Sequence, residues 1–299
     1  MATPRRSRIH VGISGWRYAG WRGEFYPAKL KQADELSFAS RAVQTIEING
    51  SHYSLQSPDS FQAWHDATPP GFQFAVKGPR FLTHMLRFRG EKTETGLANF
   101  LASGVFRLGA KLGPILWQFP PTYRFDPDAF EAVLKLLPAE TDAAAALACR
   151  HDDKVKQPEL DAVPKRRLRH AIEIRHESFV DPAFIKLLRR YRAAFVVSDA
   201  VAAWPYAEDL SADFVYLRLH GPETLYGGSY SDEALDRWAA RIDAWAHGRE
   251  PADAERISPA PAPKRAAREV FCYFDNDQKV RAPFDAARLM ARLGLSDGS

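Results

Sequence analysis

The chain has 299 residues, of which 45% are hydrophobic and 26% charged, a balance typical of folded globular proteins and not of disordered ones. No apolar run has membrane-spanning length, and the first residues lack the apolar stretch of a secretory signal, so we expect a cytoplasmic protein without a membrane partner. The net charge of +4 raises nucleic acid as a partner. However, the basic clusters at 5–8, 165–169 and 264–268 all precede predicted strands, and solvated surface charge explains them better.

Eight short apolar runs follow one another along the chain. They occupy residues 8–14, 45–49, 72–77, 114–119, 170–175, 194–199, 214–220 and 270–275. The connections between them have room for helices, which is typical of βα units in a parallel sheet. Helices are predicted from Asp181-Pro182 and from Ser231 to Gly248, where Leu235, Trp238 and Ile242 recur at helical spacing. Eight such units indicate an α/β protein with one TIM-type (β/α)8 barrel over residues 1–299.

Two connections interrupt the regular spacing. Residues 139–164 are rich in alanine and then charged, and residues 249–268 contain a run of alternating prolines. These compositions favour extended chain over a packed element. We therefore expect both segments to be peripheral, mobile insertions within a single domain.

Three of the predicted strands carry polar residues on alternate positions near their carboxyl ends. The pairs are Glu47 with Asn49, Glu173 with Arg175, and Arg218 with His220, each separated by aliphatic residues. If the aliphatic side chains face the helices, the polar ones converge inside the upper barrel, where TIM-type enzymes have their active sites. Buried charges there require partners, so the two glutamates should contact the two arginines.

This group suggests general acid/base chemistry on a small phosphorylated or otherwise anionic substrate. Glu47 or Glu173 is the expected base and His220 the expected acid, while Arg175 and Arg218 are expected to bind the anion. The alternative from the residues alone is a buried ion-pair network that only fixes the register of the strands.

Further candidates surround this group as possible ligand contacts. They are Lys77, Gln118, Asp199, Asp275 and Asn276 near strand ends, and Trp16, Tyr18 and Tyr226 in loops rich in aromatic residues. The acidic residues and His220 are also suitable ligand types for a divalent metal, but no pair of them has the spacing of a known metal motif. The cofactor therefore stays open, with a divalent metal as one option.

Several blocks of residues carry a resemblance to a known family. Among them are Ile13-Ser14-Gly15-Trp16, Glu47-Ile48-Asn49, Glu173-Ile174-Arg175-His176, Arg218-Leu219-His220-Gly221 and Tyr273-Phe274 with Asn276. In order and spacing these blocks resemble domain of unknown function 72, the YecE-like proteins, from about residue 9 to about residue 289. The resemblance implies a TIM-barrel-like fold and a soluble bacterial protein, and it supplies no reaction.

Two other functions stay open beside the acid/base enzyme. One is a metal-assisted phosphodiesterase that acts on nucleic acid, an analogy at the level of the fold. The other is a ligand-binding or scaffold protein without turnover.

Overall fold

The computed structural model describes residues 9–161, 164–201, 203–222 and 224–295. The basic cluster at 5–8 and the first residue of the first predicted strand lie outside the described residues. Within them, no helix is long and apolar enough to cross a membrane.

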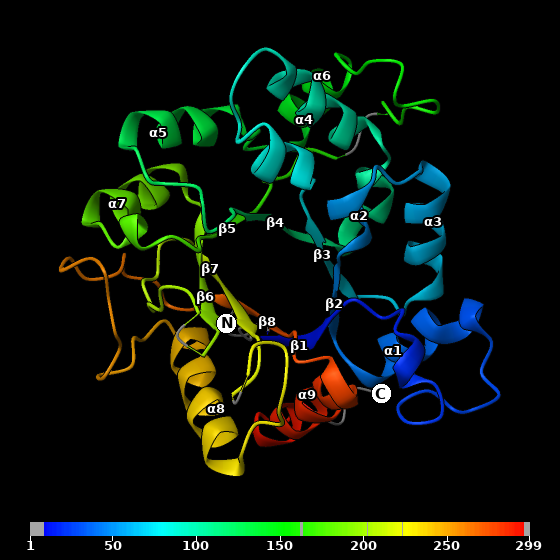
Figure 1. Ribbon diagram of the computed structural model, residues 1–299, viewed down its shortest axis with the longest axis vertical. Helices are drawn as coiled ribbons and strands as arrows, with labels where there is room; N and C mark the ends of the chain where they lie inside the picture. The colour runs from blue at the N-terminus through cyan, green and yellow to red at the C-terminus, as the bar shows by residue number, and fades with distance from the viewer. Residues whose placement is uncertain (1–8, 162–163, 202, 223, 296–299) are drawn as a thin grey trace, which may run out of the picture.

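The centre of the molecule is a closed barrel of eight parallel strands in sequence order (Figure 1). The strands are β1 (Ile9–Ser14), β2 (Thr45–Ile48), β3 (Gln73–Lys77), β4 (Leu112–Gln118), β5 (His170–Glu173), β6 (Ala194–Asp199), β7 (Phe214–Leu219) and β8 (Glu269–Phe274). Each strand pairs in parallel with its neighbour, and β1 closes the barrel against β8. This confirms the predicted TIM-type barrel.

The helices surround the strands (Figure 1). They are α1 (Glu35–Ala42), α2 (Gly50–Tyr53), α3 (Pro58–Ala67), α4 (Lys92–Ala102), α5 (Pro127–Leu136), α6 (Thr141–Ala148), α7 (Pro182–Tyr191), α8 (Asp232–Ala246) and α9 (Arg281–Arg292). Ser57, Asp126, Asp181 and Ser231 cap the N-termini of α3, α5, α7 and α8 by accepting a backbone N–H. The predicted helices at 181 and 231 are thus present.

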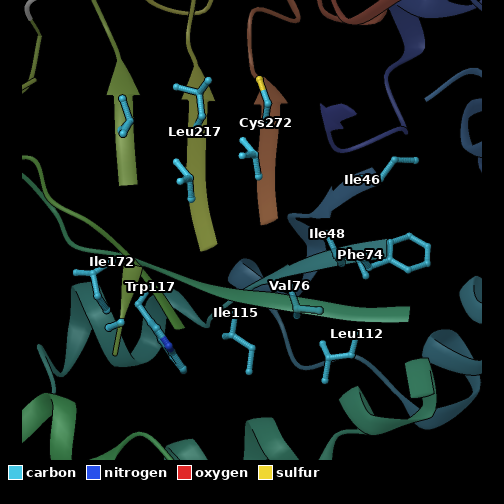
Figure 2. Packing of buried hydrophobic residues seen from close by; sticks show 14 of the residues in the cluster. Ile46, Ile48, Phe74, Val76, Leu112, Ile115, Trp117, Ile172, Leu217 and Cys272 are labelled. Atoms are coloured by element: carbon cyan, nitrogen blue, oxygen red, sulfur yellow. The ribbon is translucent and has the colours of Figure 1, made fainter. Parts of the chain in front are cut away.

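The two faces of the barrel strands carry different sets of side chains. Ile46 and Ile48 of β2, like Phe74 and Val76 of β3, belong to the large core between barrel and helices (Figure 2). A separate cluster that includes Ala75, Ala171, Val196, Tyr216 and Tyr273 lies on the alternate positions, inside the barrel. Small and aromatic side chains therefore fill the lower and middle barrel, and the next inward position on several strands is polar or charged.

The segment at 139–164 is better packed than its composition predicts. It contains α6, whose Ala144 and Ala148 are buried beside α4, and Asp152 exchanges two hydrogen bonds with Asn99 of α4, both 2.9 Å. The expectation of an unpacked insertion is therefore wrong for this part, because alanine buries a helix face without a bulky side chain. The segment at 249–268 forms no helix or strand, and Asp209 accepts hydrogen bonds from its Ile257 and Ser258 N–H groups.

Candidate functional site

Arg218 of β7 is the centre of a buried ionic network in the upper barrel. Its side chain is 1% exposed and contacts the carboxylates of Glu47, Glu173 and Asp275. Nη1 donates to Glu173 at 2.9 Å, and Nη2 donates to Glu47 and Asp275, both at 2.9 Å. Because these carboxylates come from β2, β5 and the end of β8, a single guanidinium ties together opposite sides of the barrel.

The carboxylate of Glu47 is fully enclosed and holds four hydrogen bonds. One oxygen accepts from Ser14 Oγ at 2.7 Å and from Nη2 of Arg218, and the other accepts from Tyr216 OH at 2.6 Å and from Nε of Arg218 at 3.1 Å. Burial and the Glu47 charge raise the pKa of Tyr216 well above its ordinary value, so this hydroxyl stays a donor. Glu47 has no oxygen left for a molecule outside the network.

Glu173 is enclosed in a similar way. One oxygen accepts from Gln118 Nε2 and from Arg175 Nε, both at 2.9 Å, and the other from Arg218. Burial alone would raise the pKa of Glu173, but Arg175 and Arg218 outweigh it and hold that pKa well below its ordinary value. Arg175 also stacks on Trp204, with Cζ 3.7 Å from the ring centre.

His220 is completely buried behind Asp275. Its Nδ1 lies 3.0 Å from an oxygen of Asp275, and its Nε2 lies 3.3 Å from Nη1 of Arg218. Because an arginine N–H can only donate, Nε2 is the acceptor in this contact, which leaves Nδ1 as the ring nitrogen that can carry a proton beside the carboxylate. Burial would raise the pKa of Asp275, but Arg218 and His220 lower it below the ordinary value, so Asp275 stays ionised.

These contacts confirm that the polar side chains of β2, β5 and β7 converge and that the glutamates pair with the arginines. They also place Glu47, Glu173 and His220 behind other side chains. The N–H groups of Arg218 point at three carboxylates, which leaves this arginine no N–H for a substrate anion. The predicted roles of these residues as base, acid and anion contact stay predictions, and the structure directs their hydrogen bonds to other side chains of the network.

A pocket of about 560 Å³ opens above the network at the carboxyl ends of the strands. Its walls are largely aromatic, with Trp16, Tyr18, Tyr53, Trp64 and Tyr226. Its polar lining consists of Arg17, Asn49, Gln56, Lys77, Arg218, Asp275 and Asp277. The pocket has the size and lining of a small-molecule site.

Lys77, the last residue of β3, is one of the residues that line the pocket. Its residue is 8% exposed, and none of the described carboxylates lies within ion-pair distance of Nζ. Burial, and after it the charge of Arg218, lower the pKa of Lys77 from 10.5 to about 8, although Glu47, Glu173 and Asp275 oppose the shift. A substantial fraction of this amine is thus neutral just above pH 7.

Asp277 and Asn49 complete the reactive lining. Burial raises the pKa of Asp277 to about 6, with the charge of Asp275 contributing. Asn49 donates from Nδ2 to Ser14 Oγ at 2.8 Å, while its buried Oδ1 has no hydrogen-bond partner among the described residues. This carbonyl oxygen is available to a ligand hydroxyl or amine.

Four predicted ligand contacts do not line the pocket. Arg175 contacts Glu173 and Trp204. Gln118 is behind Glu173. Asp199 accepts a hydrogen bond from Tyr230 at 3.2 Å. Asn276 donates to Gly228 O in the loop after β7 and to Asp285 of α9, both at 2.9 Å. The last two residues fasten the loop after β7 instead.

Among the residues that the structure places at the site, Tyr216 and Trp204 have no role predicted from the sequence, and Asp277 is predicted only as one of several acceptors after the last strand. Tyr216 is two positions before Arg218, so the same alternation that selected Arg218 also places Tyr216 inside. Asp277 follows a strand end, where any acidic residue is a candidate. Trp204 is in the long connection after β6, and no sequence pattern indicates its stacking on Arg175.

The acidic and histidine residues considered as metal ligands are engaged elsewhere. Glu47, Glu173 and Asp275 contact Arg218, and Asp199 contacts Tyr230. In the part of the chain that the structure describes, no three His, Cys, Asp or Glu side chains are arranged to hold a metal ion.

The chain is similar to proteins of one family. Residues 10–299 match the family model described as protein of unknown function DUF72. UPF0759 protein YunF of Bacillus subtilis is 31% identical over 121 residues, which are 38% of this chain and 41% of that protein. The match thus spans about two fifths of the length of this curated relative.

Two solved structures share the fold. A DUF72 family protein from Thermotoga maritima aligns with a TM-score of 0.73 and 23% identity, covering 96% of this chain and 99% of that one. A DUF72 family protein from Enterococcus faecalis aligns with a TM-score of 0.68 and 15% identity, covering 96% of each chain. Together with the family match over nearly the whole sequence, this shows that the chain belongs to the DUF72 family.

Proposed function

We propose that the protein is an enzyme that performs acid/base chemistry on a small anionic molecule in the pocket above Arg218. The observation that carries the proposal is the unpaired amine of Lys77 in a concave, aromatic-walled site. Arg218 contacts all three carboxylates of the network directly, and none of them forms an ion pair with Lys77. A carboxylate or phosphate of a ligand would give Lys77 a direct ion-pair partner.

Lys77 and Asp277 form the acid/base pair of this proposal. With pKa values of about 8 and about 6, the amine is mainly protonated and the carboxylate mainly ionised at pH 7. Asp277 is thus suited to accept a proton and Lys77 to stabilise or protonate a developing oxyanion. These roles differ from the predicted ones because Glu47, Glu173 and His220 have no access to the pocket.

The other charged side chains near Lys77 keep their charge state in the same pH range. Arg218, Glu173 and Asp275 stay ionised, and burial lowers the pKa values of His52 and His84 to about 3 and about 4, so both rings are neutral. We therefore expect turnover to depend on pH as a bell with limbs near 6 and 8. The lower limb reflects protonation of Asp277 and the upper limb deprotonation of Lys77.

A screen tests the proposal. Small carboxylates and phosphate esters are added to the parent protein, and ligand-induced shifts of the melting temperature are compared with those of Lys77→Met and Asp277→Asn. Compounds that bind are then incubated with the protein in D2O, and proton NMR follows the exchange of their carbon-bound protons for deuterium. We expect the ligand-induced shift of the melting temperature to require Lys77. The exchange of carbon-bound protons for deuterium should require Asp277 and show the bell-shaped dependence on pH. Shifts that persist in Lys77→Met, or binding without any Asp277-dependent exchange or conversion, would overturn the proposal.

A further inference from the structure

We propose that the amine of Lys77 forms an imine with an aldehyde or ketone, so that the pocket takes small anionic carbonyl compounds. The inference rests on the proposed function and names its substrate class. Asp277 would then remove or return a proton at the carbon next to the imine. The positively charged imine nitrogen accepts the electron pair that the broken C–H bond leaves behind. An ammonium group cannot accept this pair and can stabilise the charge only by donating a hydrogen bond.

The position of Lys77 meets the requirements of an amine nucleophile. Lys77 is the last residue of β3 and one of the residues that line the pocket, so a ligand in the pocket meets this side chain. An ion pair would lock the amine in its protonated form, and none of the described carboxylates forms one with it. Desolvation and a neighbouring cation are the two features that activate lysines for such chemistry, and Lys77 has both in its burial and in Arg218.

The surrounding groups fit the intermediates of the reaction. Trp16, Tyr18 and Trp64 provide apolar walls that limit water near the imine. The unpartnered Oδ1 of Asn49 can accept a hydrogen bond from a substrate hydroxyl. Asp277, with its raised pKa, can both donate and accept a proton near pH 7.

The condensation balances with these residues alone. The lone pair of neutral Lys77 attacks the carbonyl carbon, and one proton moves from nitrogen to the carbonyl oxygen to give a carbinolamine. The carboxylic acid form of Asp277 protonates the hydroxyl, water leaves, and the nitrogen lone pair forms the C=N bond. The products are a protonated imine, one water and the carboxylate of Asp277, which is then the base for the adjacent carbon.

Reductive trapping tests the inference. The parent protein is incubated with pyruvate, glyoxylate or glyceraldehyde 3-phosphate and reduced with sodium cyanoborohydride, followed by intact-mass and peptide analysis. We expect one saturable adduct on Lys77, with a trapping rate that is highest between about pH 6 and 8, where the neutral amine of Lys77 and the acid form of Asp277 occur together, and that falls on either side. Lys77→Arg keeps the positive charge and should lose the adduct, whereas Lys165→Arg, at an exposed position, should keep it.

The outcomes separate this inference from the proposed function. If the carbonyl compounds shift the melting temperature only when Lys77 is present but leave no adduct on it, the imine is refuted and the acid/base proposal stands. If adducts appear only on exposed lysines and no small anion binds through Lys77, both fail.

Discussion

Arg218→Met is expected to lower the free energy of unfolding by about 3–5 kcal/mol, because it leaves three carboxylates without their common partner. Glu47, Glu173 and Asp275 all contact this guanidinium, and the first two are fully buried. Urea denaturation of parent and variant at pH 7 measures the loss. The matched control is Arg190→Met, which removes an exposed ion pair with Glu131 and should cost under about 1 kcal/mol.

The size of this loss should depend on pH. Glu173 and Asp275 have depressed pKa values in the folded parent, so their contribution is present above their unfolded pKa values and disappears as the pH falls. The gap between parent and variant is therefore expected to narrow below about pH 4. Arg218→Met with Glu47→Gln should recover part of the loss at pH 7. If Arg218→Met alone were as stable as the parent at pH 7, the network would not depend on Arg218.

Lys77→Met is expected to have the opposite effect on stability and to abolish anion binding. The pKa of this amine falls from 10.5 to about 8 on folding, so below pH 8 the charged form costs about 3 kcal/mol in the folded state. Removing it should raise the free energy of unfolding by a similar order at pH 7. This gain in the free energy of unfolding should shrink as the pH rises from 8 to 10.5. In that range the Lys77 amine of the parent is neutral in the folded state and avoids the cost of a buried charge.

Lys77→Leu is the companion variant, since it tests whether the gain depends on the shape of the methionine. Unfolding of both variants is followed in urea at pH 7 and pH 10. A loss of stability in both would show that the amine serves the fold through contacts that methionine and leucine cannot replace. Its role as the reactive group of the pocket would then be wrong.

Much of this arrangement follows from alternation along the strands. Ile46 and Ile48 face the helices, so Glu47 must face inward, and the same holds for Glu173 and Arg218. The pattern also required the glutamates to find the arginines, because unpaired buried charges cost several kcal/mol. Sequence alone could therefore predict the barrel and the two glutamates and two arginines of the network, but not Asp275 as a third partner of Arg218 or Tyr216 as a donor to Glu47.

The distribution of roles could not be predicted in this way. Alternation states that Glu47 faces inward, but not that Ser14, Tyr216 and Arg218 occupy all its lone pairs. From the sequence, Lys77 is an ordinary charge at a strand end, and only the closure of the barrel shows that it is buried and that no described carboxylate pairs with it. Packing of α6 likewise depends on a contact with α4, distant in sequence, that composition does not encode.

The pKa of Lys77 is the most direct test of this account, since the proposed chemistry depends on an amine that is poised near neutral pH. It can be measured by NMR titration of the protein labelled with ¹³C at lysine Cε, with the Lys77 signal assigned by comparison with Lys77→Arg. The account predicts a midpoint near 8, well separated from that of exposed lysines such as Lys165. A midpoint near the ordinary value of 10.5 would contradict it.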